Sequence, residues 1–431
     1  MDRSTQTVWV QRGRSPSCSS AGSVVGLALM SAAATAVVVN AFADRLLARL
    51  RDDPDDPPPS RREADGAIVA IDDPPALLRV DGDTADALDA PHKAPPVDGA
   101  LSAPTEVHLA VTGRCPVRCK TCYVSAGPDV DTDDPDDLVE CLDELAAAGV
   151  FEVALGGGEA IANPSLVAIA RHARAVGLVP NVTTSGVGLD HQTAGALAEI
   201  CGQINVSLDG LGPAYRAVRG FDGSARALAA IDMLLAAGAT VGVNTVLTGR
   251  NVGQLDALAA ALRARGVRDW QWIRLKPSGR GRDVYEALRL SASQALELWP
   301  RALALSDDDL QIRFDCALVP FIAAHEPPVD SLVKLAVSGC TGGQRMLARS
   351  PTGQWAPCSF AGGGSDGPLL DAWRDDPQLL TWRARAASPP APCATCPYQQ
   401  VCRGGCRIVA AHAGDAMAPD PECPRVAAWA A

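Results

Sequence analysis

The 431-residue sequence is poor in aromatic residues, which make up 4% of it, whereas hydrophobic residues together make up 47%. Its interior must therefore consist mainly of Ala, Val, Leu and Gly. Small and branched aliphatic side chains suit closely packed layers of helices and strands. The composition favours an α/β body, and the length is sufficient for two or three domains.

The sequence also lacks a positive charge balance, because 50 acidic residues outnumber 38 basic ones and leave a formal net charge of −12. Proteins that bind nucleic acid through its phosphates present a basic face. We therefore expect no nucleic-acid partner, and the balance is that of an ordinary acidic enzyme.

Charge is absent altogether from residues 21–43, AGSVVGLALMSAAATAVVVNAFA, which follow three arginines. That layout is typical of a signal peptide or a short membrane span. Two other interpretations stay open: a true start at Met30, or a docking helix whose apolar residues from Val39 onward share one face. We expect a cytoplasmic protein without a membrane partner, because the metal chemistry argued below needs a reducing compartment.

Proline and charge separate the first part of the chain from the rest. Residues 52–61, DDPDDPPPSR, are a charged Pro-rich linker, and residues 91–104 are again rich in proline. Between them, residues 66–82, GAIVAIDDPPALLRVDG, predict a β-hairpin. We interpret residues 1–104 as an N-terminal arm with Pro-rich linkers and one small β element.

From residue 105 the pattern changes to strands that alternate with helices. Strands are predicted to begin at residues 106, 151, 179, 203, 240 and 269, and helices to span residues 135–148, 164–176, 190–200, 224–237 and 251–265. Six βα units in sequence imply a parallel sheet with right-handed crossovers. Because the strand ends are rich in Gly, Ser, Thr, Asn and Asp, we expect a partial (β/α)6 barrel with its site at the C-terminal rim.

Cysteine, in contrast, is abundant, with fourteen residues that are mostly clustered. Disulfide-dense proteins are usually small secreted domains, whereas this chain has a large α/β body, so metal binding is the better interpretation. We assign residues 105–310 to the core barrel, 311–334 to a connector and 335–425 to a Cys-rich domain with little regular secondary structure. Bound metal must contribute to the folding of this tail, which can bury little apolar surface.

The segment TGRCPVRCKTCYVSAG, residues 112–127, follows the first predicted strand and spaces its cysteines as C-x3-C-x2-C. Structural zinc takes four ligands in a closed tetrahedron, and this loop offers no histidine as the fourth. A 4Fe–4S cluster also takes four ligands, one per iron, so three cysteines leave one iron open. An open iron can bind a substrate or a cofactor.

This loop resembles the cysteine motif of the radical S-adenosylmethionine (radical SAM) superfamily. By that resemblance, Cys115, Cys119 and Cys122 hold a 4Fe–4S cluster whose open iron chelates the amino and carboxylate groups of S-adenosyl-L-methionine (SAM). One electron from the reduced cluster splits the sulfonium and yields a 5′-deoxyadenosyl radical, which abstracts hydrogen from the substrate. The barrel holds the reactants in position and excludes water from them. Thr121 stands where the family usually has an aromatic residue, and Tyr123 is placed to supply that packing instead.

Other strand ends resemble the SAM-binding positions of the same superfamily. The stretch GGGE, residues 156–159, resembles its Gly-Gly-Glu motif, in which Gly157 and Gly158 allow close backbone approach and Glu159 accepts hydrogen bonds from the SAM ammonium. The alternative is a Gly-rich strand end with a surface glutamate. The resemblance implies further SAM-binding residues at later strand ends: Thr184, Ser185, Ser207, Asp209, Arg219 and Asn244. For Arg219, implied to pair with the SAM carboxylate, the alternative is a surface helix position.

The tail carries the most specific pattern in the chain. It reads Cys340-x12-Gly353-x4-Cys358, then Cys393-x2-Cys396-x5-Cys402-x3-Cys406, and finally Cys423. These seven cysteines resemble the SPASM extension of radical SAM enzymes, which binds two auxiliary 4Fe–4S clusters. Zinc is the alternative, because C-x2-C pairs also build zinc ribbons, but seven thiols divide badly into groups of four.

The resemblance assigns these cysteines to two sites. It implies Cys340, Cys358 and Cys406 as ligands of auxiliary cluster I, nearer the active site, and Cys393, Cys396, Cys402 and Cys423 as ligands of the outer auxiliary cluster II. Cys316 follows the strand-like IRFD and is a candidate fourth ligand of cluster I; otherwise one of its irons is open. Cys141 and Cys201 lie in helical segments, where a free cysteine acts as a small apolar residue, and Cys18 fits no pattern.

SPASM enzymes mostly modify ribosomally made peptides. The resemblance covers residues 105–425 and therefore implies an oxidoreductase that forms a crosslink or thioether, epimerises or decarboxylates a peptide. Its partners would be the peptide, with or without a leader segment, and a reductant such as flavodoxin or ferredoxin. Three alternatives stay open: a sulfatase maturase that makes formylglycine, a small-molecule radical SAM dehydrogenase, and a non-catalytic iron–sulfur electron carrier. The first is disfavoured because Ser359, not an aspartate, follows Cys358.

Two further segments relate to peptide binding. Residues 66–90 have the hairpin-then-helix pattern of a leader-binding winged-helix domain but are too short to complete one. The basic run RLKPSGRGR, residues 274–282, is interpreted either as an attractor of an acidic leader or as a solvated loop. The catalytic acid or base is not identified, and Asp315, Tyr285 and Lys276 are candidates by position alone.

Overall fold

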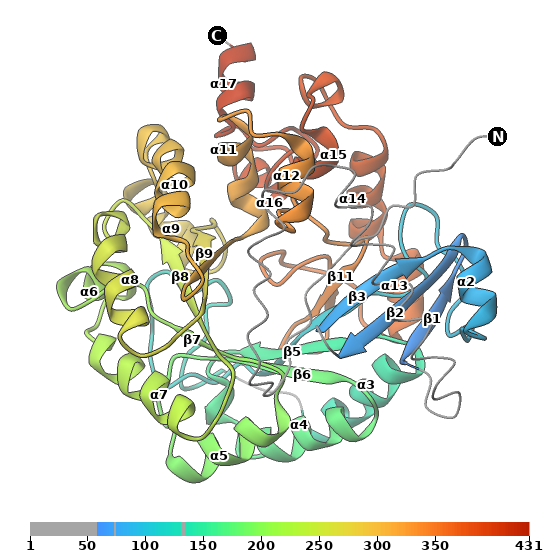
Figure 1. Cartoon of the computed structure of the whole chain (residues 1–431), viewed down its shortest axis with the longest axis horizontal. Coiled ribbons are helices and arrows are strands. Elements are labelled where there is room, and N and C mark those ends of the chain that lie inside the picture. Colours follow the sequence, from blue (N-terminus) through green and yellow to red (C-terminus); the bar gives the residue numbers. More distant parts are fainter. Residues whose placement is uncertain (1–57, 73–74, 131–133, 431) are drawn as a thin grey trace.

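The computed structural model describes residues 58–72, 75–130 and 134–430. A curved sheet forms its centre, helices cover the outside of the sheet, and the C-terminal segment lies against one side of the barrel (Figure 1). The uncharged segment 21–43 lies outside the described residues, and with it the question of a targeting segment. No helix within the described ranges is long and apolar enough to cross a membrane.

Seven parallel strands follow one another around the sheet in chain order. They are β4 (Glu106–Thr112), β5 (Glu152–Gly157), β6 (Val179–Thr184), β7 (Ile204–Ser207), β8 (Val241–Leu247), β9 (Asp269–Arg274) and β10 (Gln311–Phe314). The six strands predicted from the sequence are all present, which confirms the partial α/β barrel. β10 pairs with β9 in parallel and extends the sheet into the segment interpreted as a connector.

The expected helices alternate with these strands. On the outer face lie α3 (Pro135–Ala147), α4 (Leu166–Ala175), α5 (His191–Ile200), α7 (Ser224–Ala236) and α8 (Leu255–Arg263). Three more helices belong to the barrel: α6 (Pro213–Arg219), α9 (Gly281–Leu288) and α10 (Ala292–Leu305). Local capping sets several helix starts, since Asp134 and Asp190 each accept a backbone N–H of the first turn of α3 and α5.

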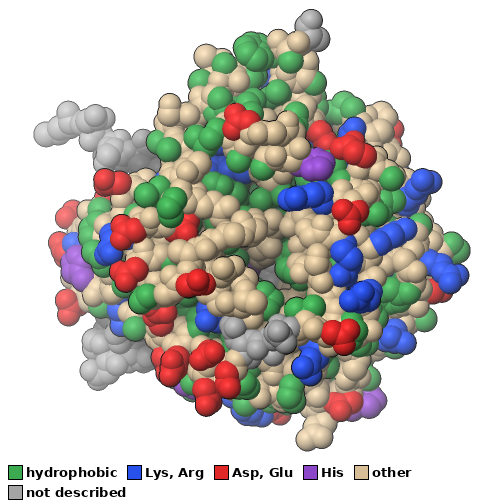
Figure 2. All heavy atoms as spheres, turned by 180° about the vertical axis from the view of Figure 1, so that it is seen from behind, with side chains coloured by type: hydrophobic (Ala, Val, Ile, Leu, Met, Phe, Trp, Pro, Cys, Tyr) green, Lys and Arg blue, Asp and Glu red, His purple; other side chains and the backbone are tan. Residues whose placement is uncertain are grey.

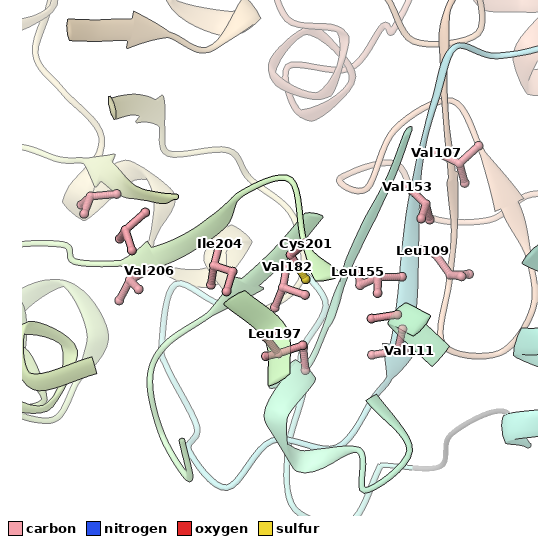
Figure 3. Packing of buried hydrophobic residues seen from close by; sticks show 14 of the residues in the cluster. Val107, Leu109, Val111, Val153, Leu155, Val182, Leu197, Cys201, Ile204 and Val206 are labelled. Atoms are coloured by element: carbon pink, nitrogen blue, oxygen red, sulfur yellow. The ribbon is translucent and has the colours of Figure 1, made fainter. Parts of the chain in front are cut away.

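Aliphatic side chains on alternate strand positions form the core between the sheet and the outer helices. Figure 3 shows Val107, Leu109 and Val111 of β4 beside the corresponding residues of β5. Cys141 of α3 and Cys201, which directly follows α5, are both buried in this core as small apolar residues. The barrel thus depends on closely packed small side chains rather than on large aromatic ones.

The opposite face of the strands, which lines the inside of the barrel, is polar. Asn181 accepts the backbone N–H of Gln203 at 2.9 Å, and the Gln203 amide donates to Asn205 at 3.1 Å and to Asp269 at 3.2 Å. Gly242 leaves room for this network, because a Cβ there would lie 1.9 Å from the Gln203 side chain. The polar groups of this network are tolerated inside the barrel because they are hydrogen-bonded to one another.

A small antiparallel sheet precedes the barrel. It consists of β1 (Ser60–Glu63), β2 (Gly66–Asp72) and β3 (Pro75–Val80), and α2 (Gly82–Ala87) follows it. The predicted hairpin is confirmed as β2 and β3, while β1 arises from the end of the predicted linker. The fully buried Arg61 donates to the carbonyls of Ala103, Pro104 and Gly149, so the sheet is anchored to the barrel.

The tail joins the barrel through the same central sheet. Its strand β11 (Met346–Arg349) pairs in parallel with β4 and antiparallel with β12 (Trp355–Ala356). The connector adds two short helices, α11 (Val319–Ala323) and α12 (Val329–Lys334). The helices that follow are α13 (Leu369–Asp375), α14 (Pro377–Ala387), α15 (Gln399–Cys402), α16 (Arg407–His412) and α17 (Pro424–Ala430). Strand pairing to β4 places the tail cysteines next to the end of the barrel that carries the first cysteine loop.

Candidate functional site

The first cysteine loop begins where β4 ends. Its neck is closed by a hydrogen bond from the Cys115 N–H to the Gly127 carbonyl at 2.9 Å. Cys115 is buried, while Cys119 and Cys122 are partly exposed. The pKa of the Cys115 thiol is raised to about 11, mainly by burial and to a smaller extent by the nearby Cys119 and Cys122. The loop therefore gathers all three thiols at the C-terminal end of one strand.

Gly157 and Gly158 pack directly against the backbone of this loop. A Cβ on Gly157 would lie 2.3 Å from the Thr112 carbonyl oxygen, and one on Gly158 would lie 2.2 Å from that of Arg114. The N–H of Gly158 donates to Thr112 at 2.7 Å, and that of Glu159 donates to Arg114 at 3.0 Å. These two positions thus require glycine because the end of β5 and the cysteine loop, two segments of the same chain, pack closely there.

Glu159 lies buried at the end of β5 and is held by neighbouring hydroxyl and amide groups. Its carboxylate accepts the Thr184 hydroxyl at 2.6 Å and the Ile161 N–H at 3.2 Å. Ser185 donates both its N–H, at 2.8 Å, and its hydroxyl. Cys115 interacts electrostatically with this carboxylate. Three residues named from sequence, Glu159, Thr184 and Ser185, therefore lie together beside the cysteine loop, and the glutamate is not on the surface.

Asp209 and Arg219 form a buried ion pair next to Cys119. The Arg219 Nε donates to Asp209 at 2.6 Å, and its Nη1 lies 3.8 Å from the Cys119 sulfur. Burial by itself lowers the pKa of Arg219, but the adjacent Asp209 carboxylate raises it above the ordinary value. Asp209 also accepts the Val246 N–H at 2.7 Å. Both residues thus hold the cysteine loop against the ends of β7 and β8, and Arg219 is not a surface residue.

Ser207 and Asn244 face each other across β7 and β8, where they are directly paired in register. The Asn244 Oδ1 is buried and has no hydrogen-bond partner among the described residues. A buried acceptor without a donor is costly, so it signals a missing partner. The SAM-binding positions implied by the sequence therefore share one rim, and one of them presents a free acceptor there.

Four tail and connector cysteines form a second group, which we call site I: Cys316, Cys340, Cys358 and Cys406. Cys316 interacts electrostatically with Cys340 and Cys406, and Cys358 interacts with Cys340 and Cys406. Burial raises the pKa of Cys358 to about 12 and that of Cys406 to about 11. Cys316 is positioned by the turn that follows β10, where Asp315 accepts the Ala317 N–H.

A third group, which we call site II, comprises Cys393, Cys396, Cys402 and Cys423. These four thiols line one cavity of about 250 Å³, together with Tyr398 and Trp429. The pKa of Cys393 is raised to about 11, mainly by burial, and the neighbouring Cys423 and Cys396 contribute to this rise. The spacing seen in the sequence thus corresponds to one hollow lined on several sides by sulfur.

All thirteen cysteines within the described ranges are free thiols, so disulfides do not hold the tail. No three His, Cys, Asp or Glu side chains of those ranges converge closely enough to hold a single metal ion. A cluster with one cysteine per iron holds its ligands further apart than a single ion does. The donor set of soft thiols in groups of three and four fits iron–sulfur clusters.

The basic run 274–282 is mostly buried between the barrel and the tail. Arg274 donates to Asp420 at 2.6 Å and to Glu422 at 2.8 Å, and Lys276 pairs with Asp315. Figure 2 shows other Lys and Arg side chains on the surface, but within the run Arg282 is the exposed basic residue. The run therefore joins two parts of the molecule, and it is not a solvated loop.

The three positional candidates for a catalytic acid or base lie in this same joint. Asp315 and Lys276 neutralise each other, and the Tyr285 hydroxyl donates to Glu422 at 2.7 Å. Burial raises the pKa of Tyr285 above its ordinary range. All three residues are buried. The Tyr285 contact joins α9 to the tail, and the Lys276–Asp315 pair joins the end of β9 to the turn after β10.

Tyr123 connects the first cysteine loop to site I. Its ring lies 4.7 Å from that of Phe360, two residues after Cys358, and Lys276 lies over the same phenyl ring. The Ser278 hydroxyl lies within hydrogen-bonding distance of both the Tyr123 and Phe360 carbonyls, at 3.0 and 2.8 Å. The aromatic residue after the third cysteine thus packs on the tail.

A polar chain that sequence reasoning missed also reaches site I. The Nδ1 of His108 lies 2.8 Å from the Ser359 hydroxyl, and its Nε2 lies 3.1 Å from Glu106. Glu106 and His108 are on the inner face of β4, whereas Ser359 directly follows Cys358. The period-two alternation of β4 predicts which residues face inward, but no local signal pairs His108 with a serine 251 positions later.

Comparison with known proteins identifies the chain. A family profile described as "Radical SAM superfamily" matches residues 109–262. The mycofactocin maturase MftC of Mycobacterium ulcerans is 32% identical over 341 residues, covering 75% of this chain and 88% of that protein. The chain belongs to the radical SAM superfamily. Members of this superfamily bind SAM and a 4Fe–4S cluster.

Further radical SAM proteins resemble it over a similar length. The PqqA peptide cyclase of Methylocella silvestris is 30% identical over 340 residues, covering 74% of this chain and 87% of the relative. The crystal structure of Streptococcus suis SuiB bound to S-adenosylmethionine has a TM-score of 0.62 at 18% identity, covering 75% of this chain and 78% of SuiB. The likeness to SuiB shows a shared fold that extends well beyond residues 109–262.

Proposed function

We propose that this radical SAM enzyme oxidatively modifies a ribosomally made peptide. The names of its relatives support the peptide substrate, since one is a mycofactocin maturase and another a peptide cyclase, and SuiB has been solved with its precursor peptide SuiA. The observation that carries the proposal is the gathering of three separate thiol groups around one barrel. A single SAM cluster needs only the first group, so the other two indicate an enzyme that also handles electrons from its substrate.

For the first site, we propose Cys115, Cys119 and Cys122 as the ligands of the SAM cluster. When bound, that cluster supplies the electron that splits SAM into methionine and a 5′-deoxyadenosyl radical. The residues of the chain position the reactants around it. Asp209 and Arg219 hold the Cys119 segment, and the Gly157–Gly158 contact fixes the height of the loop above the strand ends.

For SAM itself, we propose that Glu159 receives the ammonium group. Thr184 and Ser185 keep its carboxylate oriented, and burial strengthens a charge-assisted contact. The free Oδ1 of Asn244 is the acceptor offered to a donor group of the adenosine, with Ser207 beside it on the neighbouring strand. These residues bind and orient, and the barrel excludes water from the reacting atoms.

For the auxiliary clusters, we propose that Cys316 completes site I as the fourth ligand with Cys340, Cys358 and Cys406. Site I is then closed and carries electrons without binding substrate at iron. At site II, the four cysteines around the 250 Å³ cavity hold the outer cluster. A reductant such as flavodoxin or ferredoxin supplies electrons from outside, and the small β1–β3 sheet anchored by Arg61 is available to a leader segment.

The sulfatase-maturase alternative is less well supported. In place of an aspartate after the second tail cysteine, this chain has Ser359, whose hydroxyl is engaged by His108 at 2.8 Å. A neutral hydroxyl in that setting cannot act as the carboxylate base that a formylglycine-forming enzyme uses at this position.

Anaerobic reconstitution tests the proposal directly. We expect about 12 iron atoms per chain, four in each of three clusters, and release of 5′-deoxyadenosine when SAM and a reductant are added. The variant in which Cys115, Cys119 and Cys122 are all changed to Ala should keep the iron of the auxiliary clusters but release no 5′-deoxyadenosine. Stoichiometric zinc with no iron in the wild type would overturn the proposal.

The peptide substrate is tested by mass spectrometry. We expect a short peptide encoded by a neighbouring gene to lose the mass of removed hydrogen or carbon dioxide. The amount of peptide changed should rise together with the amount of 5′-deoxyadenosine released. The triple-Ala variant is the control for background cleavage. Turnover of SAM with no change in any neighbouring peptide, but conversion of a sulfatase peptide, would favour the formylglycine alternative.

A further inference from the structure

Arg407 is a buried arginine that has no carboxylate partner among the described residues. Its residue exposure is 2%, and neither its Nε nor its Nη1 has a hydrogen-bond partner. Arg383 and Arg385 also have no ion pair among the described residues, but each donates at least two hydrogen bonds to backbone carbonyls. Three other arginines with little exposure have a carboxylate partner. Arg61 pairs with Glu63, Arg219 with Asp209, and Arg274 with Asp420. The positive charge of Arg407 is thus left without the counter-charge that these residues have.

The guanidinium of Arg407 lies beside the thiols of site I. Arg407 begins α16 directly after Cys406, and its guanidinium carbon lies 4.9 Å from the centroid of the Trp382 ring. Trp382 packs in one buried cluster with Cys340 and Cys358. Both of these thiols interact electrostatically with Arg407. Three of the four site I cysteines are therefore neighbours of Arg407: Cys406 precedes it in the chain, and Cys340 and Cys358 pack with the Trp382 ring that it covers.

A buried charge of this kind needs an anion. An isolated charge in the interior costs several kcal/mol, and a guanidinium cannot relieve that cost by losing its proton. Neutral thiols provide no counter-charge. Four cysteine thiolates around an iron–sulfur core do, because their combined negative charge exceeds the positive charge of the core. The missing partner of Arg407 thus has the charge of a loaded cluster and the location of site I.

We propose that Arg407 is the counter-cation of auxiliary cluster I and raises the reduction potential of that cluster. The inference rests on the proposed function, because it takes site I to be an iron–sulfur site. Reduction adds negative charge to a cluster, so a fixed cation nearby stabilises the reduced form. In this role Arg407 acts on the cluster through its charge beside the cysteine ligands, and it does not act on the peptide.

The neighbouring Arg403 does not play the same part. Its Nη1 donates to the Gln344 side chain at 3.1 Å and lies 3.4 Å from the Cys340 carbonyl oxygen, so neutral acceptors solvate its charge. Arg407 lacks such acceptors and lies on an aromatic ring instead. The distinction makes Arg407 the residue to test.

The test compares Arg407→Met with Arg407→Lys and with the matched control Arg383→Met. Arg383 is also buried, lies 4.7 Å from the centroid of the Trp373 ring and leaves its Nη1 without a partner. It donates, however, to the carbonyls of Gly343 and Trp373, and its charged neighbour is Asp376 rather than a cysteine. Arg383→Met therefore removes an equally buried cation that has no cysteine neighbour.

The first measurement is an EPR-monitored redox titration of the reconstituted full chain, in which the signal lost in Cys340→Ala identifies cluster I. We expect Arg407→Met to shift the midpoint of that signal to a more negative potential than in the wild type. The midpoint of Arg407→Lys should lie close to the wild-type value, and that of Arg383→Met should equal it. An unshifted midpoint in fully loaded Arg407→Met protein would overturn the proposal.

The second measurement is the melting temperature with and without clusters. Without clusters, Arg407→Met should melt a few degrees higher than wild type because an unpaired buried charge is removed. With clusters it should melt lower, whereas Arg383→Met should melt lower in both states. Equal destabilisation of Arg407→Met in both states would also overturn the proposal. A chain that loads its clusters but releases no 5′-deoxyadenosine would contradict only the proposed activity.

Discussion

At the scale of single residues, Glu159 is constrained more tightly than a motif suggests. Four donors from Ile161, Thr184 and Ser185 surround its carboxylate, so its position is set before any ligand arrives. A preorganised anion in a buried site gives up little freedom when it meets a cation. The motif resemblance indicates that Glu159 is a candidate site residue. The hydrogen bonds explain what holds its carboxylate in one position.

Replacing Glu159 with Gln should weaken SAM binding about 10–100-fold, because a hydrogen bond to a charged group contributes about 1.5–3 kcal/mol. Isothermal titration calorimetry on the reconstituted protein measures this directly. Ser185→Ala is the control, since it removes one supporting donor and keeps the carboxylate. Equal SAM affinity in Glu159→Gln and wild type would show that Glu159 does not bind SAM.

Cys316 is the residue whose role depends most on tertiary contacts. We expect Cys316→Ala to lose iron at site I or to convert that cluster to a 3Fe form, visible in the iron content and the EPR spectrum. Cys201→Ala, at a buried core cysteine, should keep about 12 irons, the full content of three clusters. If Cys316→Ala retained full iron and an unchanged spectrum, cluster I would have an open iron.

At the scale of elements, the site is built where strand ends meet loops. β4 and β5 are joined by contacts that admit no side chain, and the loop between them carries three cysteines. Tyr123 then links that loop to the tail through Phe360.

Gly158→Ala should disrupt the first cysteine loop, because the added methyl would meet the Arg114 carbonyl at 2.2 Å. We expect loss of about four irons per chain, the content of one cluster. Gly156→Ala is the matched control, since nothing lies within 4 Å of its added Cβ. Iron analysis and SAM cleavage separate the two, and equal iron in both variants would show that the loop tolerates the change.

At the scale of the whole molecule, a buried ionic joint holds the tail on the barrel. Arg274 of β9 contacts Asp420 and Glu422, and β11 adds the tail to the barrel sheet beside β4. The basic run thus joins the two regions that carry the clustered cysteines, and its buried side chains are not available to attract a partner.

Arg274→Met should cost about 3–5 kcal/mol of unfolding free energy, because it leaves Asp420 buried without its partner. Chemical denaturation of the cluster-free chain measures this, and limited proteolysis should then cleave near the tail first. Arg374→Ala, at a largely exposed ion pair with Asp371, should change the free energy by less than about 1 kcal/mol. Similar losses in the two variants would show that the joint contributes little.

The sequence by itself determined the elements whose signals are local. Six strands and their helices follow from apolar periodicity and caps, and the cysteine spacings indicate which thiols belong to one loop. Residues with several possible partners were not predictable in this way. The burial of Arg274, the approach of Cys316 to Cys340, and the contact of His108 with Ser359 each join segments far apart in the chain.

Only the tertiary structure decided those contacts, because charge and thiol chemistry do not specify a partner until the backbone brings one within reach. The run 274–282 has the same composition whether it is solvated or buried, and β10 and β11 are too short to carry a clear period. Pairing of β11 with β4 settles where the tail lies. That placement sets Arg407 against the cysteines of site I and leaves its charge to be balanced there.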